Sequence, residues 1–378
     1  MRMSISSFSF YLSVLLICLP LFAVSVSEVY PQSSDGPKPT KQAIRNKSEK
    51  AKKKKKPKRH VRFELHSRIT TKYTNNLFEV RRAWENQFSI KNEPGQRFEG
   101  LAGPEDQVSR IAVDAGMKWK LRKKRSFDFF VHIDYNSHLR NPIANYLFLD
   151  AGIAYDISKH DHLQLYVDYI PNRFKKNYKV QTPAGETFKP AYYFEFEAGI
   201  RYKRDWNKQW SNVFGYGLAT REFEAPFTNR NRTAHRFTMQ SNHDLFRKVD
   251  ISFGAAYTAA FTPSGMEFGV TADRSFNNIL FKTKLDLDLP KHWDVSAGVK
   301  YRIRDYTTNV QADEARYARK NARWSATFEV KKRLWKRGLL VLDVLWMLNQ
   351  TNKDDDEIDP DLAGYRVFSV GAGIQHKI

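Results

Sequence analysis

A strict alternation of apolar and charged residues between Phe276 and Ile303 constrains the fold of this chain more than any other feature. The first apolar set is Ile279, Phe281, Leu285, Leu287 and Leu289, and the second is Trp293, Val295, Ala297, Val299, Tyr301 and Ile303. A period of two predicts a pair of β-strands, each with one apolar face and one charged face. The charged face is rich in lysine, arginine and aspartate, as expected when a closed sheet has lipid outside and water inside.

The same pattern recurs from residue 61 to the end of the chain and predicts about fourteen strands. Their expected ranges are 61–72, 108–119, 127–137, 146–157, 160–171, 190–203, 209–222, 232–245, 249–262, 274–288, 292–305, 320–332, 338–350 and 364–378. Between them, long connections such as 73–107 and 172–189 alternate with short ones such as 158–159 and 204–208. Short turns at one end and longer loops at the other are typical of outer-membrane barrels. We therefore expect an all-β fold, a transmembrane up-and-down antiparallel β-barrel of about 14 strands that occupies residues 61–378.

Composition is compatible with a barrel and not with a bundle of membrane-spanning helices. The mean hydropathy is −0.61, and after the N-terminal region no segment has the roughly 20 apolar residues that a spanning helix needs. Any insertion must therefore use strands. Aromatic residues near predicted strand ends suit the interfacial girdles of a barrel: Trp119, Tyr169, Tyr202, Trp210, Trp293, Trp324 and Trp346.

Residues 1–27 are predicted to be a secretory signal peptide. Arg2 precedes the apolar run FYLSVLLICLPLFAV, and small residues follow at Ser25 and Ser27, after either of which we expect cleavage. The only cysteine, Cys18, is either a residue of this apolar core or a lipid-modification site, and bulky Ile17 before it favours the first. The mature chain then has no disulfide, and its sheet must hold the fold.

Residues 28–60 are predicted to form a disordered, Lys-rich periplasmic linker. Of the net charge of +22, this segment carries +9 and Arg2 carries +1, which leaves +12 for residues 61–378. The run from Lys52 to Arg59 is either a solvated spacer or a contact for anionic head groups, peptidoglycan or a periplasmic partner. In isolation such a run would also suit nucleic acid, but the signal peptide argues against nucleic acid as a partner.

The predicted short turns are basic, and the last long loop is acidic. The basic turns contain Arg122 to Arg125, Lys159-His160, Lys203-Arg204, Arg247-Lys248 and Lys331 to Arg333. They either attract anionic lipid or simply solvate the rim. The acidic residues are Asp354, Asp355, Asp356, Glu357, Asp359 and Asp361. Their spacing is not that of an EF-hand, so we favour a solvated loop over a site for the divalent cations that bridge lipopolysaccharide.

The stretch TTKYTNNLF follows the first predicted strand and contains Tyr73, Asn75, Asn76 and Phe78. It resembles the Tyr-x-x-Asn-aromatic opening of bacterial β-barrel porins of the second type, some of which accompany exopolysaccharide export. With its loop alternation, the chain is similar over residues 61–378 to Gram-negative outer-membrane porins. The resemblance implies the cell outer membrane, with its lipid and lipopolysaccharide as surroundings. Ile378 departs from these porins, in which the last residue is usually aromatic.

The polar faces of the strands, assigned inward, divide by charge. Strands three to six carry the acidic residues Asp134, Asp150, Asp168, Glu195 and Glu197. Strands ten to twelve carry the basic residues Lys282, Lys284, Lys300, Arg302, Arg304 and Arg323. In a ring of about fourteen strands the two sets lie nearly half a turn apart, so an acidic wall faces a basic wall. Such a lumen selects solutes by charge; alternatively, the charges pair across a plugged lumen and only stabilise it.

No catalytic or metal-binding constellation is predicted. The histidines His132, His138, His235 and His243 are scattered, and no serine stands at a spacing that pairs it with one of them and with an orienting carboxylate or amide. His160 and His162 sit in a turn and offer few ligands. We expect no enzymatic activity and no cofactor.

The favoured function is a channel for small hydrophilic solutes, with a mild preference for anions because the barrel is basic. The alternative is a structural or accessory envelope barrel for the export of polysaccharide or surface molecules, with residues 28–60 as its periplasmic contact.

Overall fold

The computed structural model describes residues 61–79, 93–121, 125–183, 185–246, 248–263, 265–267, 270–311, 313, 316–352 and 364–377. The predicted signal peptide and linker, residues 1–60, lie outside the described residues. So do the acidic run from Asp354 to Asp361, most of the basic turn at 122–124, Arg247 and Ile378.

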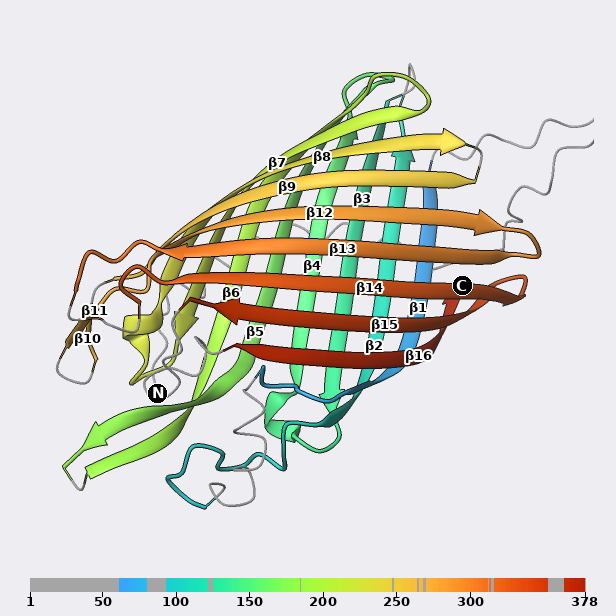
Figure 1. Cartoon of the computed structure of the whole chain (residues 1–378). Helices are drawn as coiled ribbons and strands as arrows, with labels where there is room; N and C mark the ends of the chain where they lie inside the picture. The colour runs from blue at the N-terminus through green and yellow to red at the C-terminus, as the bar shows by residue number, and fades with distance from the viewer. Residues whose placement is uncertain are drawn as a thin grey trace, which may run out of the picture. The chain divides into compact units, whose positions relative to one another are not determined.

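Fourteen antiparallel strands close into one barrel, in which each strand pairs with the next and β16 pairs with β1 (Figure 1). The strands are β1 (Val61–Thr74), β2 (Asp106–Lys120), β3 (Ser126–His138), β4 (Tyr146–Asp156), β5 (Asp161–Thr182), β6 (Gly185–Asp205), β7 (Trp210–Phe223), β8 (Arg232–Phe246), β9 (Val249–Phe261), β12 (Phe276–Leu289), β13 (Trp293–Tyr306), β14 (Lys320–Trp335), β15 (Gly338–Thr351) and β16 (Tyr365–Lys377). β9 pairs directly with β12, because β10 (Gly265–Glu267) and β11 (Val270–Ala272) form a separate hairpin in the loop between them. The predicted fold class and strand number are confirmed.

One predicted loop is wrong. Residues 172–189 were expected to connect two strands, but most of them continue β5 and β6 as a hairpin that projects from the barrel (Figure 1). The pairing shifts register between Ile170 and Arg173 and again between Phe174 and Lys176. These irregularities break the period of two and increase the local twist. Tyr178 of the extension packs in one buried cluster with Tyr193, Phe223 and Phe227, which supports the hairpin where it leaves the barrel.

The connections alternate in length, as predicted. The turns at one end are short and span 121–125, 157–160, 206–209, 247–248, 290–292 and 336–337; we call this end the short-turn rim. At the other end, the long-loop rim, the connections are longer, at 75–105, 139–145, 224–231, 262–275, 307–319 and 352–364, together with the β5–β6 hairpin. Because β1 begins at the short-turn rim and β16 ends there, the chain enters and leaves the barrel at the same end.

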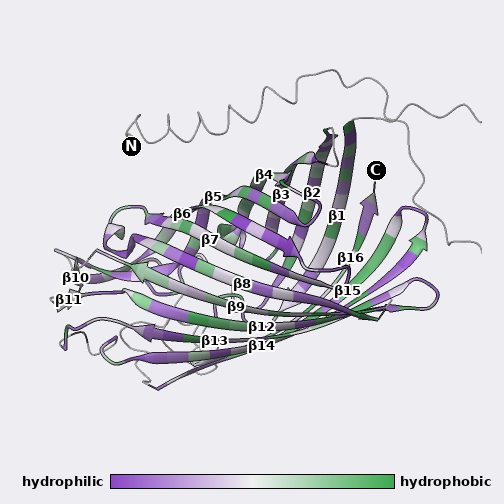
Figure 2. Ribbon diagram, turned by 90° about the horizontal axis from the view of Figure 1, so that it is seen from above, coloured by the Kyte–Doolittle hydropathy of each residue, from purple (hydrophilic) through white to green (hydrophobic). Residues whose placement is uncertain are grey.

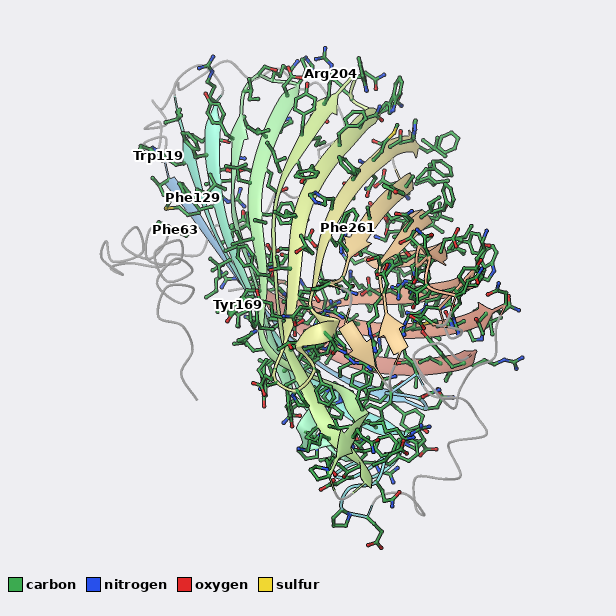
Figure 3. The ribbon with its side chains drawn as sticks, turned by 90° about the vertical axis from the view of Figure 1, so that its left-hand side faces the viewer. Phe63, Trp119, Phe129, Tyr169, Arg204 and Phe261 are labelled. Carbon is green, nitrogen blue, oxygen red and sulfur yellow. The ribbon has the colours of Figure 1, made fainter. Side chains whose placement is uncertain are left out.

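Apolar side chains cover the outside of the barrel. Phe63 is 69% exposed and Phe281 51% exposed, and the hydropathy of the strands alternates along their length (Figure 2). Figure 3 shows Phe63 and Trp119 on the outer side of the strands. A closed barrel with such a face satisfies its backbone hydrogen bonds internally and offers an apolar surface to lipid. The closed sheet and its apolar outer face are those of a transmembrane β-barrel.

Among the described residues, no helix is long and apolar enough to cross a membrane.

The first loop is anchored to the last strand. Asn75 donates from its backbone N–H to the carbonyl of Phe368 at 3.1 Å, and its side-chain oxygen accepts from the Phe368 N–H at 2.7 Å. Asn76 is buried, and its amide donates to the carbonyl of Arg366 at 3.1 Å. The two asparagines of the TTKYTNNLF stretch therefore extend the pairing of β1 with β16 beyond Thr74.

Candidate functional site

The predicted acidic and basic sets lie on the inward face of the barrel, on separate arcs. All but Asp150 alternate with exposed apolar residues of their own strands, and Asp150 lies directly opposite the inward-facing His132 and Asp168. The acidic arc is formed by β3 to β6 and contains Asp134, Asp150, Asp168, Glu195 and Glu197. The basic arc is formed by β12 to β14 and contains Lys282, Lys284, Lys300, Arg302, Arg304 and Arg323. In barrel order β7, β8 and β9 separate the two arcs on one side, and β2, β1, β16 and β15 separate them on the other.

Three carboxylates of the acidic arc are compensated by arginines one or two strands away. Asp134 accepts from the Arg110 Nε at 2.7 Å, and Glu195 forms an ion pair with Arg221. Glu197 binds the Arg236 guanidinium at 2.8 Å and accepts from the Tyr166 hydroxyl at 2.9 Å. These arginines are missing from the predicted lumen residues, although the same period of two also places Arg221 and Arg236 on the inward face.

Asp150 and Asp168 differ from the other members of the acidic arc. They lie directly opposite each other on β4 and β5, and Asp168 in turn lies opposite Glu197 on β6. Like charges directly opposite each other in a sheet are unfavourable by roughly 0.2–1 kcal/mol per pair. Among the described residues, neither Asp150 nor Asp168 forms an ion pair with a cationic side chain.

The basic arc places cationic side chains directly opposite one another. Lys282 lies directly opposite Lys300, and Arg302 lies directly opposite Arg323. Lys282 donates to the Gln240 side-chain oxygen at 2.6 Å, a neutral partner. Arg304 stacks over the Phe276 ring, with 4.1 Å from its guanidinium carbon to the ring centroid.

Within the described part of the chain, Lys300 and Arg302 form no ion pair with a carboxylate. Water and mobile anions in a lumen are the natural counterpart of such a surface.

Glu79 of the first loop reaches the basic arc from the long-loop rim. Its carboxylate binds the Arg323 guanidinium at 3.0 Å and accepts from the Tyr365 hydroxyl at 2.7 Å. This contact joins the first loop to β14 and β16. Glu79 is thus one described residue of the first loop that contacts inward-facing side chains.

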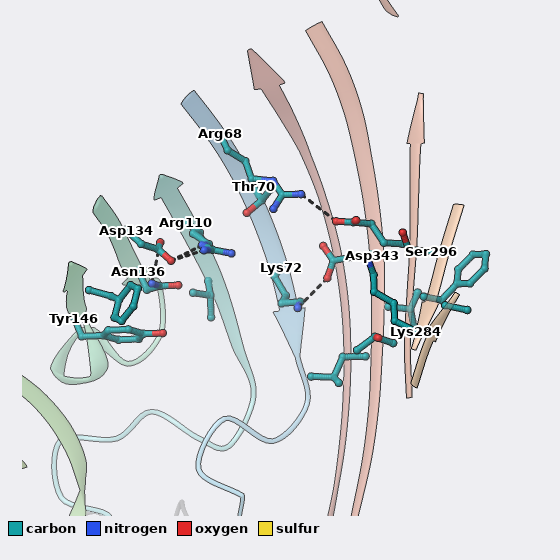
Figure 4. Close-up of a pocket in the computed structure, with 18 of the residues that line it drawn as sticks. Arg68, Thr70, Lys72, Arg110, Asp134, Asn136, Tyr146, Lys284, Ser296 and Asp343 are labelled. Carbon is teal, nitrogen blue, oxygen red and sulfur yellow. Dashed lines mark hydrogen bonds and ion pairs between the residues drawn. The ribbon is translucent and has the colours of Figure 1, made fainter. Parts of the chain in front are cut away.

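A cavity of about 720 Å³ lies between β1 to β5 and β12 to β15 (Figure 4). Among the predicted residues it brings together Asp134 of the acidic arc and Lys284 of the basic arc, which line the same space. Arg68 and Lys72 of β1 line it too, where they bind Glu329 at 3.0 Å and Asp343 at 2.8 Å. Side chains of both signs of charge therefore border the cavity.

One contact was not expected from the sequence. The Ser241 hydroxyl lies 2.9 Å from His243 Nε2 on the outer face of β8, where the His243 ring stacks on Trp210. Among the described residues, no carboxylate or amide is hydrogen-bonded to the Nδ1 of His243, so the pair lacks the orienting group of a catalytic triad.

His162 likewise forms a structural bridge, because it lies between Asp156 at 2.6 Å and Asp205 at 3.2 Å. The described residues contain no group of three or more potential ligands arranged to hold a metal ion.

No family model matches the chain, and no curated protein matches it. Several solved structures are similar in architecture. A bacterial polysaccharide outer membrane secretin has 8% identity and a TM-score of 0.44, with 83% of this chain and 98% of that chain covered. An anion-selective porin from Comamonas acidovorans has 12% identity and a TM-score of 0.38, with 84% and 100% covered. The outer membrane channel DcaP of Acinetobacter baumannii has 10% identity and a TM-score of 0.45, with 84% and 97% covered. At these values nothing about solute or partner is carried over from those proteins.

Proposed function

We propose that this protein is an outer-membrane channel that passes small hydrophilic solutes and prefers anions. One observation carries the proposal: Lys300 and Arg302 face the lumen without a carboxylate partner among the described residues, whereas Asp134, Glu195 and Glu197 each have an arginine. Uncompensated positive charge beside an aqueous path raises the local concentration of anions. The acidic and basic residues of the two arcs act together as the selectivity surface of this path.

The test is the reversal potential of the purified protein in a planar bilayer under a gradient of potassium chloride. We expect the sign that indicates chloride preference, and cation selectivity would contradict the proposal. Swelling of liposomes in sugars of graded size and charge would then define the solutes that pass.

The alternative function, an accessory envelope barrel for export, depends on residues 28–60, whose Lys-rich run suits an anionic periplasmic contact. Deletion of residues 28–60 separates the two functions. A channel keeps its conductance after this deletion, whereas an accessory barrel loses a partner that co-purifies with the full chain. If this segment contacts peptidoglycan, the full chain sediments with isolated cell-wall sacculi and the variant that lacks residues 28–60 does not.

A further inference from the structure

Five aspartates line the inner face of four adjacent strands at the short-turn rim. They are Asp244 on β8, Asp250 on β9, Asp286 and Asp288 on β12, and Asp294 on β13. Three pairs among them lie directly opposite each other across the sheet: Asp244 with Asp250, Asp250 with Asp286, and Asp288 with Asp294. We call this set the aspartate mouth. The sequence interpretation did not single it out, because its members come from four strands whose register the sequence does not state.

The aspartate mouth is mostly uncompensated. Asp286 binds Lys284 at 2.6 Å and accepts from the Ser296 hydroxyl, whereas the other four form no ion pair with a described residue. Asp294 lies opposite Lys331, but that lysine binds Glu329 at 2.6 Å.

Elsewhere at the same rim, the acids are matched by cations. Asp128 binds Lys118 at 2.8 Å and Asp205 binds Lys203 at 2.9 Å. The basic residues Lys248 and Lys291 lie in the turns beyond the strand ends. Net negative charge in the lumen therefore collects at this mouth.

The same strands carry positive charge toward the long-loop rim. On β12 the inward residues change sign between Lys284 and Asp286, and on β13 they run from Asp294 through Lys300 and Arg302 to Arg304. From Asp294 to Arg304 the strand covers roughly 33 Å, because a strand rises about 3.3 Å per residue. The ion pair Lys284–Asp286 marks the boundary between an acidic and a basic section of one wall.

We propose that this axial arrangement makes the lumen rectify ionic current. The inference rests on the proposed channel function and deepens it. When the side of the short-turn rim is positive, cations enter through the aspartate mouth and anions enter past Arg302 and Arg304, so both kinds of ion accumulate within the lumen. At the opposite polarity cations enter past Arg302 and Arg304 and anions enter through the aspartate mouth. Each kind of ion is then repelled at its entrance, and the lumen is depleted of both. Conductance is therefore higher when the short-turn side is positive.

Ionic strength decides how strongly the charges act. The Debye length is about 10 Å at 0.1 M salt and about 3 Å at 1 M. A barrel of fourteen strands is narrower than the 16- to 18-stranded porins that enclose open aqueous channels, so charges on its wall reach the axis at 0.1 M but not at 1 M. We expect rectification at low salt that fades at high salt.

The experiment measures current at equal positive and negative voltages across a planar bilayer, after insertion from one side and with the orientation established by protease added to one chamber. At 0.1 M potassium chloride we expect roughly a twofold larger current with the short-turn side positive, and a ratio near one at 1 M. The triple variant D250N/D288N/D294N should lower the low-salt ratio toward one, and so should K300Q/R302Q, because each removes part of the charge of one section. D305N is the matched control: Asp305 lies on β13 as well, but it faces outward and binds Lys320 at 3.6 Å, so the ratio should stay as in the wild type.

The outcomes separate the rectification from the channel itself. An anion-selective current whose ratio at positive and negative voltage is one at 0.1 M contradicts the rectification but not the channel function. A current ratio that D250N/D288N/D294N leaves unchanged does the same. The absence of any current overturns both.

Discussion

Arg68 on β1 binds Glu329 on β14 at 3.0 Å, although β16 and β15 lie between these two strands in the barrel. Lys72 on β1 similarly reaches Asp343 on β15 at 2.8 Å, across β16. Both contacts cross the seam where the last strand meets the first. The inward positions of β16 at this seam are glycines. An added Cβ on Gly371 would lie 2.6 Å from the Asp343 carboxylate, and Gly373 packs against the backbone of β1.

Replacement of Gly373 by alanine should weaken the seam. An added Cβ would lie 2.3 Å from the carbonyl oxygen of Ile69 on β1, so the backbone of one strand must move. Overpacking of this kind costs about 1–3 kcal/mol. The measurement is the temperature at which the folded band of the protein is lost on gels in detergent, which we expect to fall.

Gly116→Ala provides the matched control for the seam variant. Gly116 is an inward glycine of β2, and a Cβ there meets only the Phe129 carbonyl oxygen at 3.7 Å, an ordinary contact. This variant should unfold at the wild-type temperature or slightly above it, since glycine weakens strand interiors. Equal effects of the two substitutions would contradict the steric account of the seam.

Neutralisation of Lys300 and Arg302 should reduce the preference for anions. A unit charge about 10 Å from the pore axis contributes about 0.4 kcal/mol in water, which corresponds to roughly a twofold change in the permeability ratio for each charge removed. The readout for K300Q/R302Q is the reversal potential at low salt, with D305N as the outward-facing control. A reversal potential identical to that of the wild type would show that these two side chains do not act on the permeant ions.

Glu79→Gln should change selectivity in the opposite direction. The substitution removes the negative charge that now binds Arg323 and leaves the shape of the side chain almost unchanged. We expect a stronger preference for anions. Tyr365→Phe removes the other hydrogen bond to Glu79 without a change in charge, so its reversal potential should stay close to that of the wild type. If Y365F moved the reversal potential as far as E79Q, loop position rather than charge would be responsible.

The projecting β5–β6 hairpin should unfold independently of the barrel. Tyr178 is buried against Phe227, and the Arg230 guanidinium lies 3.3 Å from the centroid of its ring. Tyr178→Ala should cost about 3–5 kcal/mol locally, as truncations of large buried aromatic residues do. Limited digestion with trypsin should then cut between residues 171 and 190 while the remaining strands stay folded.

Leu139→Ala is the comparison for the hairpin variant, because Leu139 is 70% exposed in a neighbouring loop. Its digestion pattern should match that of the wild type. A Tyr178→Ala protein that loses the whole barrel would show that the hairpin is required for closure.

The contact between Ser241 and His243 should have no catalytic consequence. Without an orienting partner on Nδ1, the histidine is a poor general base. The purified protein in detergent should release no fatty acid from phospholipid above the rate of Ser241→Ala. A rate that depends on Ser241 would contradict this expectation and assign the outer face of β8 an enzymatic function.

Most strands lie within a few residues of the bounds that the alternation predicts, because a period of two is a local property that each strand displays by itself. The prediction was wrong for residues 172–189, where two register shifts exchange the faces of the hairpin and hide the alternation. All eleven predicted lumen residues lie on the inward face, as the period of two predicts, because every second residue of a strand lies on the same face. Their function as a selectivity surface remains a prediction.

The alternation by itself determined that the chain forms a closed barrel with an apolar outside, a charged inside and loops sorted by length. Only the tertiary structure decided which charges meet. Arg68 with Glu329 and Glu79 with Arg323 come from segments far apart in sequence, and the five members of the aspartate mouth come from four strands. The physical reason is that alternation specifies the face on which a side chain lies, whereas its neighbours on that face depend on strand order and register, which are set by pairing across the whole sheet.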